Sequence, residues 1–62
     1  MYTITGVKNG VSTLHVESDT SASGALNRCR AMQLLHGAAI VHDAAGAEIS
    51  ELELSKRVQQ EG

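Results

Sequence analysis

The chain has 62 residues, of which 42% are hydrophobic, and Tyr2 is its one aromatic residue. A domain of this size buries only about 60% of the surface that its unfolded chain exposes, and here no Phe or Trp contributes to the core. Small domains of this kind often add a disulfide, a metal ion or a second subunit. The single cysteine, Cys29, excludes an internal disulfide. We therefore expect one domain that forms a homo-oligomer, most simply a dimer.

The formal net charge of −2 at pH 7 indicates neither a basic surface for nucleic acid nor an acidic tail. The chain does not begin with a basic segment followed by an apolar run, and no stretch is long and apolar enough to span a bilayer. The lone cysteine agrees with a reducing compartment. These features predict a cytoplasmic protein without a membrane segment.

Two N-terminal segments, residues 2–7 and 11–17, are rich in Thr, Val and Ile and are bounded by turn residues, which predicts two strands. The turn between them has two possible forms. One is a two-residue turn of Asn9 and Gly10, and the other is a three-residue loop, 8–10, closed by Gly10 in the left-handed conformation.

The choice of turn decides the register of this hairpin. A two-residue turn would place Ile4 on the opposite face from Leu14, whereas the three-residue loop pairs Ile4 with Leu14 and Tyr2 with Val16. We predict the three-residue loop because it gathers the apolar side chains on one face. The other face then holds mostly hydroxyl and imidazole side chains, namely Thr3, Thr5, Thr13 and His15.

A helix is predicted after this hairpin. Several N-capping side chains lie at residues 18–21, and the helix should run from Thr20 or Ser21 to His36, with Gly37 just past its end as the C-cap. Its apolar residues recur with helical spacing at Ala22, Ala25, Leu26, Cys29 and Met32. Leu34 falls on the polar side, where it can extend an interface.

A second hairpin is predicted at residues 39–43 and 47–50. Asp43 and Gly46 occupy the first and fourth positions of a type I turn, which those residue types favour. A three-residue loop then sets three cross-strand pairs: Val41 with Ile49, His42 with Glu48, and Ile40 with Ser50.

The C-terminal segment has the spacing of a helix start. Ser50 and Glu53 match a capping box, and Glu53 lies four residues before Arg57, a favourable helical pair. We predict a short helix from Glu51 to about Gln60. The alternative is that Leu52 and Leu54 alternate as a continuation of the last strand.

The predicted fold is α+β in the order β-β-α-β-β, followed by a short C-terminal helix, with a mostly antiparallel sheet and the main helix on one face. The helix ending in Gly37, the hydrophobic strand, the Asp-x-x-Gly turn at 43–46, Ile49 and Ser50 resemble short bacterial proteins of unknown function. Those proteins often carry a Trp in the first strand, which this chain lacks. The resemblance implies the same β-β-α-β-β core and assigns no site residue.

The histidines are the first candidates for chemistry, because imidazole titrates near neutrality and binds metals. His36 is explained by the negative end of the helix dipole, and His42 by a cross-strand pair with Glu48. No sulfur or second acidic ligand is spaced to join His15. We predict no metal site and no cofactor.

The remaining reactive residue types have ordinary explanations too. Cys29 lies on the predicted core stripe, and nothing places a base beside it. The glycines are too far apart for a phosphate-binding loop. The predicted solvent-facing carboxylates are Glu48, Glu51 and Glu53. We predict no catalytic residue, which favours a protein that is not an enzyme.

Nucleic acid is not the expected partner. The five basic residues are Lys8, Arg28, Arg30, Lys56 and Arg57. Arg28 and Arg30 point about 200° apart around a helix, and no aromatic side chains are available on the sheet for base stacking.

One helix on a four-stranded sheet leaves one sheet face uncovered. The residues predicted to form an interaction surface are Thr3, Thr5, Thr13, His15, Ile40 and His42 on that face, with Leu34 on the helix. The sequence therefore predicts a homodimeric protein-interaction module. The second hypothesis is a nucleic-acid-associated protein whose dimer combines the helix arginines. The third is an enzyme or metal site assembled across a dimer interface from His15 or His42.

Overall fold

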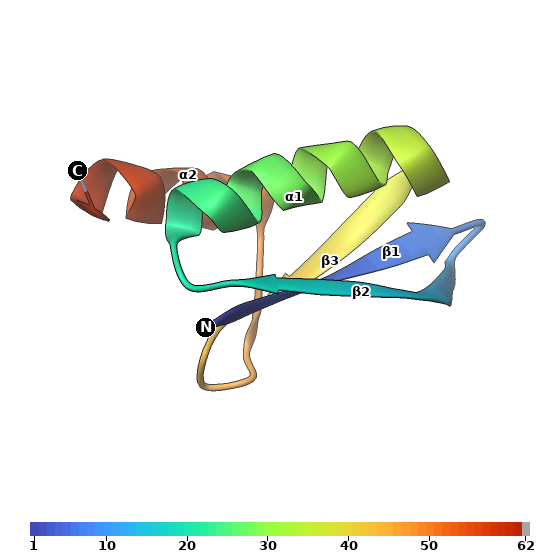
Figure 1. Cartoon of the computed structure of the whole chain (residues 1–62), viewed down its shortest axis with the longest axis horizontal. Coiled ribbons are helices and arrows are strands. Elements are labelled where there is room, and N and C mark those ends of the chain that lie inside the picture. Colours follow the sequence, from blue (N-terminus) through green and yellow to red (C-terminus); the bar gives the residue numbers. More distant parts are fainter. Residues whose placement is uncertain (62) are drawn as a thin grey trace.

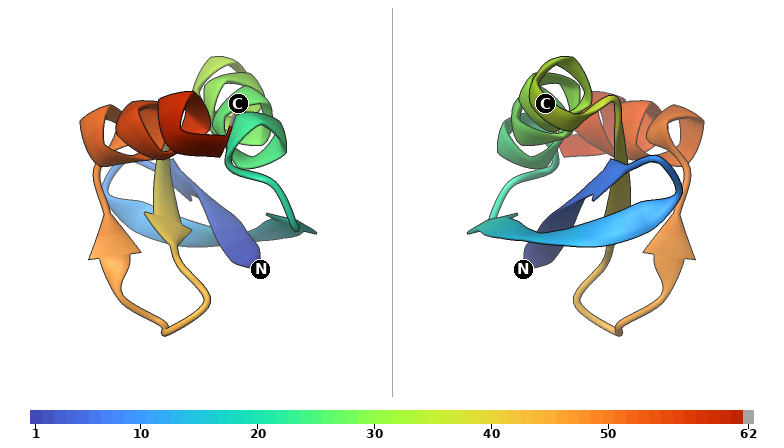
Figure 2. Two further views of the ribbon diagram at one scale, coloured as in Figure 1. Left: turned by 90° about the vertical axis from the view of Figure 1, so that its left-hand side faces the viewer. Right: turned by 90° about the vertical axis from the view of Figure 1, so that its right-hand side faces the viewer.

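The computed structural model describes residues 1–61, which form one sheet and two helices. The elements in chain order are β1 (Tyr2–Lys8), β2 (Val11–Asp19), α1 (Ala22–His36), β3 (Ala38–His42), β4 (Glu48–Ile49) and α2 (Glu51–Glu61). The strand order is β2-β1-β3-β4, and every neighbouring pair is antiparallel. Both helices lie on one side of the sheet (Figures 1 and 2). The predicted α+β class is confirmed.

Helix α1 begins and ends where the capping residues predict. The Ser21 hydroxyl accepts a hydrogen bond from the Gly24 N–H at 3.0 Å. At the other end Gly37 has φ of 107°, and its N–H donates to the carbonyl of Gln33 at 2.8 Å. The five predicted core residues of this helix are all buried: Ala22, Ala25, Leu26, Cys29 and Met32.

The C-terminal segment is a helix, and the alternative of a continued strand is excluded. The Ser50 hydroxyl caps α2 by accepting a hydrogen bond from the Glu53 N–H at 3.1 Å. Glu53 and Arg57 form the expected pair one turn apart, with 3.6 Å between Oε1 and Nε. Leu54 points into the core and is fully buried.

The two helices lie next to each other and cross at an angle (Figure 2), and they run in roughly opposite directions (Figure 1). At one end the Glu61 carboxylate, near the C-terminus of α2, accepts hydrogen bonds from the backbone N–H groups of Ala22 and Ser23 at 2.5 and 3.3 Å. At the other end the Gln33 amide donates to Glu51 at 2.9 Å. A carboxylate at the start of α1 also complements the helix dipole.

The hydrophobic core lies between the helices and the two central strands. Its members are Ile4, Val41 and Leu54 together with the five buried residues of α1. Strand β2 contributes no residue to this cluster. Leu54 of α2 thus fills the part of the core that Leu14 and Val16 of the second strand were predicted to fill.

The predicted three-residue loop of the first hairpin is wrong. Lys8 pairs with Val11, so the loop is the two residues Asn9 and Gly10. Both have positive φ, 55° and 77° respectively, as a type I′ turn requires, and Asn-Gly is the favoured sequence for that turn. The local turn preference therefore overrides the apolar pattern.

The register predicted for this hairpin is wrong as well. Ile4 pairs with Glu17 instead of Leu14, and Tyr2 pairs with Asp19 instead of Val16. A β-bulge between Thr5 and Val7 accounts for part of this shift in register. Thr5 pairs with Val16 and Val7 with Ser12, so that Gly6 alone faces residues 13–15 of β2.

This register turns the apolar residues of β2 away from the helices. Leu14 is fully exposed at 102% and Val16 is 54% exposed, because their neighbours His15 and Glu17 point toward α1 and side chains alternate along a strand. Thr13 and His15 therefore lie on the helix side, not on the uncovered face where they were predicted.

The other predicted residues of the uncovered sheet face do lie there. Ile4 points into the core, so Thr3 and Thr5 point away from it, and their partners on β3 are His42 and Ile40. We call this surface the open face. It comprises Thr3, Thr5, Leu14, Val16, Ser18, Ile40 and His42.

The second hairpin has the predicted turn. The Asp43 N–H donates to the Ala47 carbonyl, and the Gly46 N–H donates to the Asp43 carbonyl, both at 2.9 Å. The Asp43 carboxylate accepts from the N–H groups of Ala45 and Ala47, both at 3.0 Å.

The predicted pairs Val41–Ile49 and His42–Glu48 are also confirmed. The predicted pairing of Ile40 with Ser50 is not formed. Strand β4 ends at Ile49 because Ser50 caps the helix that follows.

Replacing Gly46 by Val tests this turn. Gly46 has φ of 85°, and a left-handed conformation costs an L-residue roughly 1–2 kcal/mol, so we expect a loss of that order in the free energy of unfolding. Ala45→Val, at the exposed neighbouring position, is the control and should change little. Thermal unfolding followed by circular dichroism measures both, and equal melting temperatures would contradict the turn assignment.

Candidate functional site between β2 and α1

The polar side chains of β2 meet α1 where a hydrophobic contact would be usual. His15, Glu17 and Asp19 alternate along β2 on its helix side, and their side chains are 37%, 31% and 22% exposed. Arg28 and His36 of α1 face them. An arrangement that departs from ordinary hydrophobic patterning points to a functional or strained site, so this contact is the candidate site.

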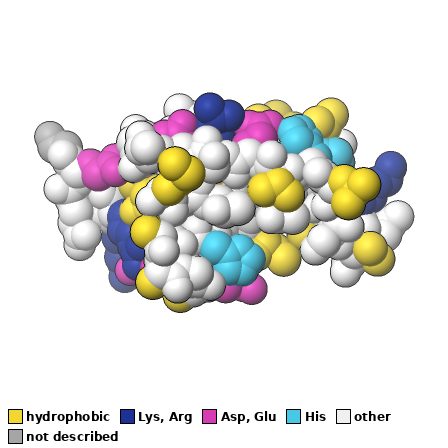
Figure 3. All heavy atoms as spheres, turned by 60° about the horizontal axis from the view of Figure 1, so that its bottom comes forward, with side chains coloured by type: hydrophobic (Ala, Val, Ile, Leu, Met, Phe, Trp, Pro, Cys, Tyr) yellow, Lys and Arg dark blue, Asp and Glu magenta, His cyan; other side chains and the backbone are white. Residues whose placement is uncertain are grey.

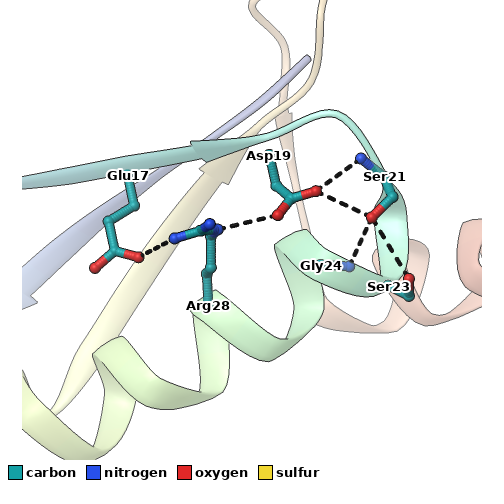
Figure 4. Close-up of polar contacts among 6 residues, drawn as sticks. All are labelled: Glu17, Asp19, Ser21, Ser23, Gly24 and Arg28. Atoms are coloured by element: carbon teal, nitrogen blue, oxygen red, sulfur yellow. Dashed lines mark hydrogen bonds and ion pairs between the residues drawn. The ribbon is translucent and has the colours of Figure 1, made fainter.

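Arg28 joins the two carboxylates of β2 (Figure 4). Its Nη1 donates to Glu17 Oε1 at 2.6 Å, and its Nε donates to Asp19 Oδ2 at 3.1 Å. The hydrogen bond from Arg28 is the main cause that lowers the pKa of Glu17. The pKa of Asp19 is lowered first by the backbone N–H of Ser21 and then by Arg28. Both carboxylates are therefore ionised and neutralised near neutral pH.

Asp19 also fixes the start of α1. Its Oδ1 accepts from the N–H and the hydroxyl of Ser21 at 2.9 and 3.0 Å. The same hydroxyl caps Gly24, as Figure 4 shows. A Cβ at Gly24 would lie 2.4 Å from the Asp19 carboxylate. The glycine in the first turn of the helix is thus required by the close approach of Asp19.

The histidines lie at the opposite end of this contact. His15 Nδ1 is 2.9 Å from His36 Nε2, and His15 Nε2 is 2.7 Å from Glu17 Oε2. The rings meet edge to face, with an interplanar angle of 76°. Gly6 of β1 provides the space, since a Cβ there would lie 2.6 Å from His36 Cδ2. The bulge opposite Gly6 and the position of His36 are therefore one structural unit.

Together these contacts form a continuous polar chain along the β2–α1 contact. Its members in order are His36, His15, Glu17, Arg28, Asp19 and Ser21. Each pair of neighbours is joined by a hydrogen bond, so this polar chain of side chains can hold β2 against α1 and can respond to a change in protonation. Within residues 1–61, no group of three or more His, Cys, Asp or Glu side chains is placed to hold a metal ion.

The other residues considered from the sequence lie elsewhere. His42 is on the open face, opposite Thr3 and Glu48. Leu34 is 91% exposed on α1. Cys29 is buried, and its burial raises the pKa of the thiol, which keeps the thiol protonated.

A concavity adjoins the Asp19–Ser21 end of the polar chain. It has a volume of about 420 Å³ and is lined by Met1, Tyr2, Thr20, Asp43, Ala44, Ala45, Arg57 and Glu61. Arg57 donates to Asp43 at 3.4 Å, and Glu61 binds the start of α1. The polar chain remains the candidate site because its side chains replace the hydrophobic contact expected between a strand and a helix.

The polar chain was not predicted from the sequence. Glu17 and Asp19 were not candidate residues, and Arg28 was considered only as a contact for nucleic acid, because the predicted three-residue loop placed the wrong side of β2 against the helix. A signal was nevertheless present, since His15, Glu17 and Asp19 alternate with period two. That spacing indicates one polar strand face.

Comparison with known protein families, with curated proteins and with solved structures finds no match to this chain. Neither helix within residues 1–61 has the length and apolar character needed to cross a membrane.

Replacing Arg28 by Gln tests the carboxylate contacts through pH. A carboxyl whose pKa is lowered by folding stabilises the fold above its unfolded pKa, and that contribution is lost as the pH falls through the folded pKa. Wild-type stability should thus decrease in acid as Glu17 and Asp19 are protonated. In Arg28→Gln we expect lower stability at pH 7 and a weaker dependence on acid. Arg30→Gln, at an exposed site on the same helix, should retain the wild-type profile in chemical denaturation.

Proposed function

We propose that this protein is a homodimeric interaction module in which the open face binds the open face of a second copy. The main support for this proposal is the orientation of β2, which turns its apolar side chains outward. Leu14 is fully exposed and Val16 is more than half exposed, while the polar neighbours of both residues point toward α1. A small domain that turns apolar side chains outward from an uncovered sheet gains stability when a partner covers them.

The chemistry of the open face favours an uncharged partner surface. Its residues are aliphatic, hydroxyl or imidazole side chains. Glu48 pairs with His42 and so lies on the same side of the sheet, where it is a charged residue at the β4 edge. Figure 3 shows this side of the molecule, with hydrophobic and uncharged atoms across the middle and charged groups mostly toward the periphery. A surface of this composition fits apolar contact better than binding to a phosphate backbone.

A second copy of the chain fits this surface. In a two-fold dimer each subunit contributes the same patch, and an uncharged patch meets its copy without like-charge repulsion. Packing of the two sheets about 10 Å apart would place the exposed Leu14 and Val16 in the interface.

The sheet edges favour face packing over strand addition. Strand β4 is only two residues long, and β2 carries the bulge opposite Gly6 together with inward-pointing Glu17 and Asp19. Short edge strands, bulges and inward charges are features that prevent edge-to-edge pairing. Among the surfaces of the sheet, the open face is therefore the one that remains for association.

Leu14→Asp and Leu34→Asp form a matched pair that tests this proposal. Both leucines are exposed, at 102% and 91%, but Leu14 lies on the open face and Leu34 on α1. Light scattering over a wide range of protein concentrations should show a wild-type dimer. Because a buried unpaired charge is costly, Leu14→Asp should weaken the dimer by about a hundredfold or more, whereas Leu34→Asp should not.

Two results would contradict the proposal. One is a wild-type protein that stays monomeric at the highest concentration. The other is a dimer that dissociates in Leu34→Asp and persists in Leu14→Asp, which would move the interface to the helices. Circular dichroism spectra of both variants verify that the fold is retained.

A further inference from the structure

The contact between His15 and His36 depends on the number of protons that it holds. The Glu17 carboxylate accepts at His15 Nε2, so that nitrogen carries the hydrogen. In neutral His15 the Nδ1 atom then carries no hydrogen, and its lone pair accepts a hydrogen bond from the Nε2–H of His36, with 2.9 Å between the two nitrogens. One hydrogen between the two rings makes this bond.

A first added proton is compatible with the contact, and a second is not. One imidazolium ring can still donate to the other ring. Two imidazolium rings would direct an N–H from each side into the same 2.9 Å gap and would place two like charges together.

The charged groups around the histidines do not remove this conflict. On β2 the facing group is Glu17, and on α1 it is Arg28, which neutralises Glu17 and reaches Asp19. From β1 the neighbour is Gly6, which has no side chain to donate or accept. A single carboxylate shared with Arg28 cannot balance two imidazolium ions.

The histidine contact lies on the helix side of β2, opposite the exposed side chains of Leu14 and Val16. His15 stands between Leu14 and Val16 in β2, so its attachment to α1 keeps both neighbours on the open face. It also lies in the segment 13–15, which faces Gly6 alone and lacks regular pairing with β1. Thr13 is held by its hydroxyl bond to the Gly6 carbonyl, and Val16 is held by its pairing with Thr5. The histidine contact is the tie to α1 for the residues between them, Leu14 and His15.

We propose that the His15–His36 contact holds β2 against α1 in a proton-dependent way and so keeps Leu14 and Val16 directed toward a second copy of the chain. The dimer then forms near neutral pH and dissociates in acid. This inference rests on the proposed dimer and adds its regulation. Histidine titrates in the range that cells use for pH signals. The dissociation should follow the second proton taken up by the pair.

The test is sedimentation equilibrium of the full chain between about pH 8 and pH 5, with two histidine variants. Wild-type association should weaken about tenfold or more across this range. His36→Gln keeps a donor for His15 Nδ1 but removes one titrating group, so its dimer should resist acid. His42→Gln replaces the imidazole that lies on the open face itself. Compared with the same variant at about pH 8, its dimer should weaken in acid as much as the wild-type dimer does, because the sensitivity arises at the His15–His36 contact.

The opposite pattern overturns the proposal. If His36→Gln dissociates like the wild type, or if His42→Gln alone becomes acid-resistant, the sensitivity does not arise from the His15–His36 contact. If the wild type is monomeric at every pH, the dimer itself fails. NMR of the ring nitrogens then still tests the contact, because a hydrogen bond between His15 Nδ1 and His36 Nε2 should be observed near neutral pH and lost in acid. Its absence near neutral pH refutes the inference.

Discussion

Replacing Leu54 by Ala is expected to lower the free energy of unfolding by about 2–5 kcal/mol. Leu54 is fully buried in the core, and it is the one buried residue of α2 among those described. The substitution removes the one fully buried apolar side chain by which α2 enters the core cluster, where Val58 is only partly buried, and it leaves a cavity in that cluster. A loss of this size is a large part of the total stability of a small domain.

Leu52→Ala is the matched control for this prediction. Leu52 is the same residue type on the same helix, but it is 69% exposed, so its truncation should change stability by no more than about 0.5 kcal/mol. Urea unfolding followed by circular dichroism measures both variants. Equal midpoints for the two variants would show that α2 does not close the core.

The importance of Leu54 explains why the first hairpin departs from its apolar pattern. Burying Leu14 or Val16 on the helix side would contribute about 1.5–3 kcal/mol each. The structure instead fills the core from α2 and uses the helix side of β2 for ion pairs with Arg28. The preference of Asn9-Gly10 for a type I′ turn acts in the same direction.

The elements that sequence analysis predicted correctly are determined by residues close together in the chain. Ser21 and Gly37 bound α1, and Ser50 starts α2, through hydrogen bonds that span three or four residues. The turn from Asp43 to Gly46 is equally local. Such signals can be recognised without knowledge of the tertiary structure.

The candidate site depends on contacts between distant residues, and this is why the sequence did not predict it. Arg28 meets Glu17 across 11 positions, and His15 meets His36 across 21. Those contacts exist only if β2 turns its odd-numbered residues toward α1. One wrong choice at the turn, where Asn9-Gly10 forms a two-residue loop, therefore reversed the prediction for the whole strand.

Replacing Gly6 by Val should disrupt the unit that joins the bulge to the histidine contact. A Cβ at this position would lie 2.6 Å from His36 Cδ2 and 3.0 Å from Thr13 Oγ1. The Thr13 hydroxyl donates to the Gly6 carbonyl at 3.0 Å, so it has little freedom to move. Overpacking of this kind typically costs about 1–3 kcal/mol, and we expect a loss of that order in the free energy of unfolding.

Thr5→Val is the control for this substitution, because it adds the same β-branched residue to β1 on the open face. Its effect on the free energy of unfolding should be small. In Gly6→Val, NMR should also show that the hydrogen bond between His15 and His36 is lost, because the His36 ring must move away from the new methyl groups. A Gly6→Val protein with wild-type stability and an intact histidine contact would refute the close packing of His36 on β1. If stability changes little but the contact is lost, His36 has moved aside, and the dimer of this variant should then be weak at neutral pH as well as in acid, because the contact that supports it is missing.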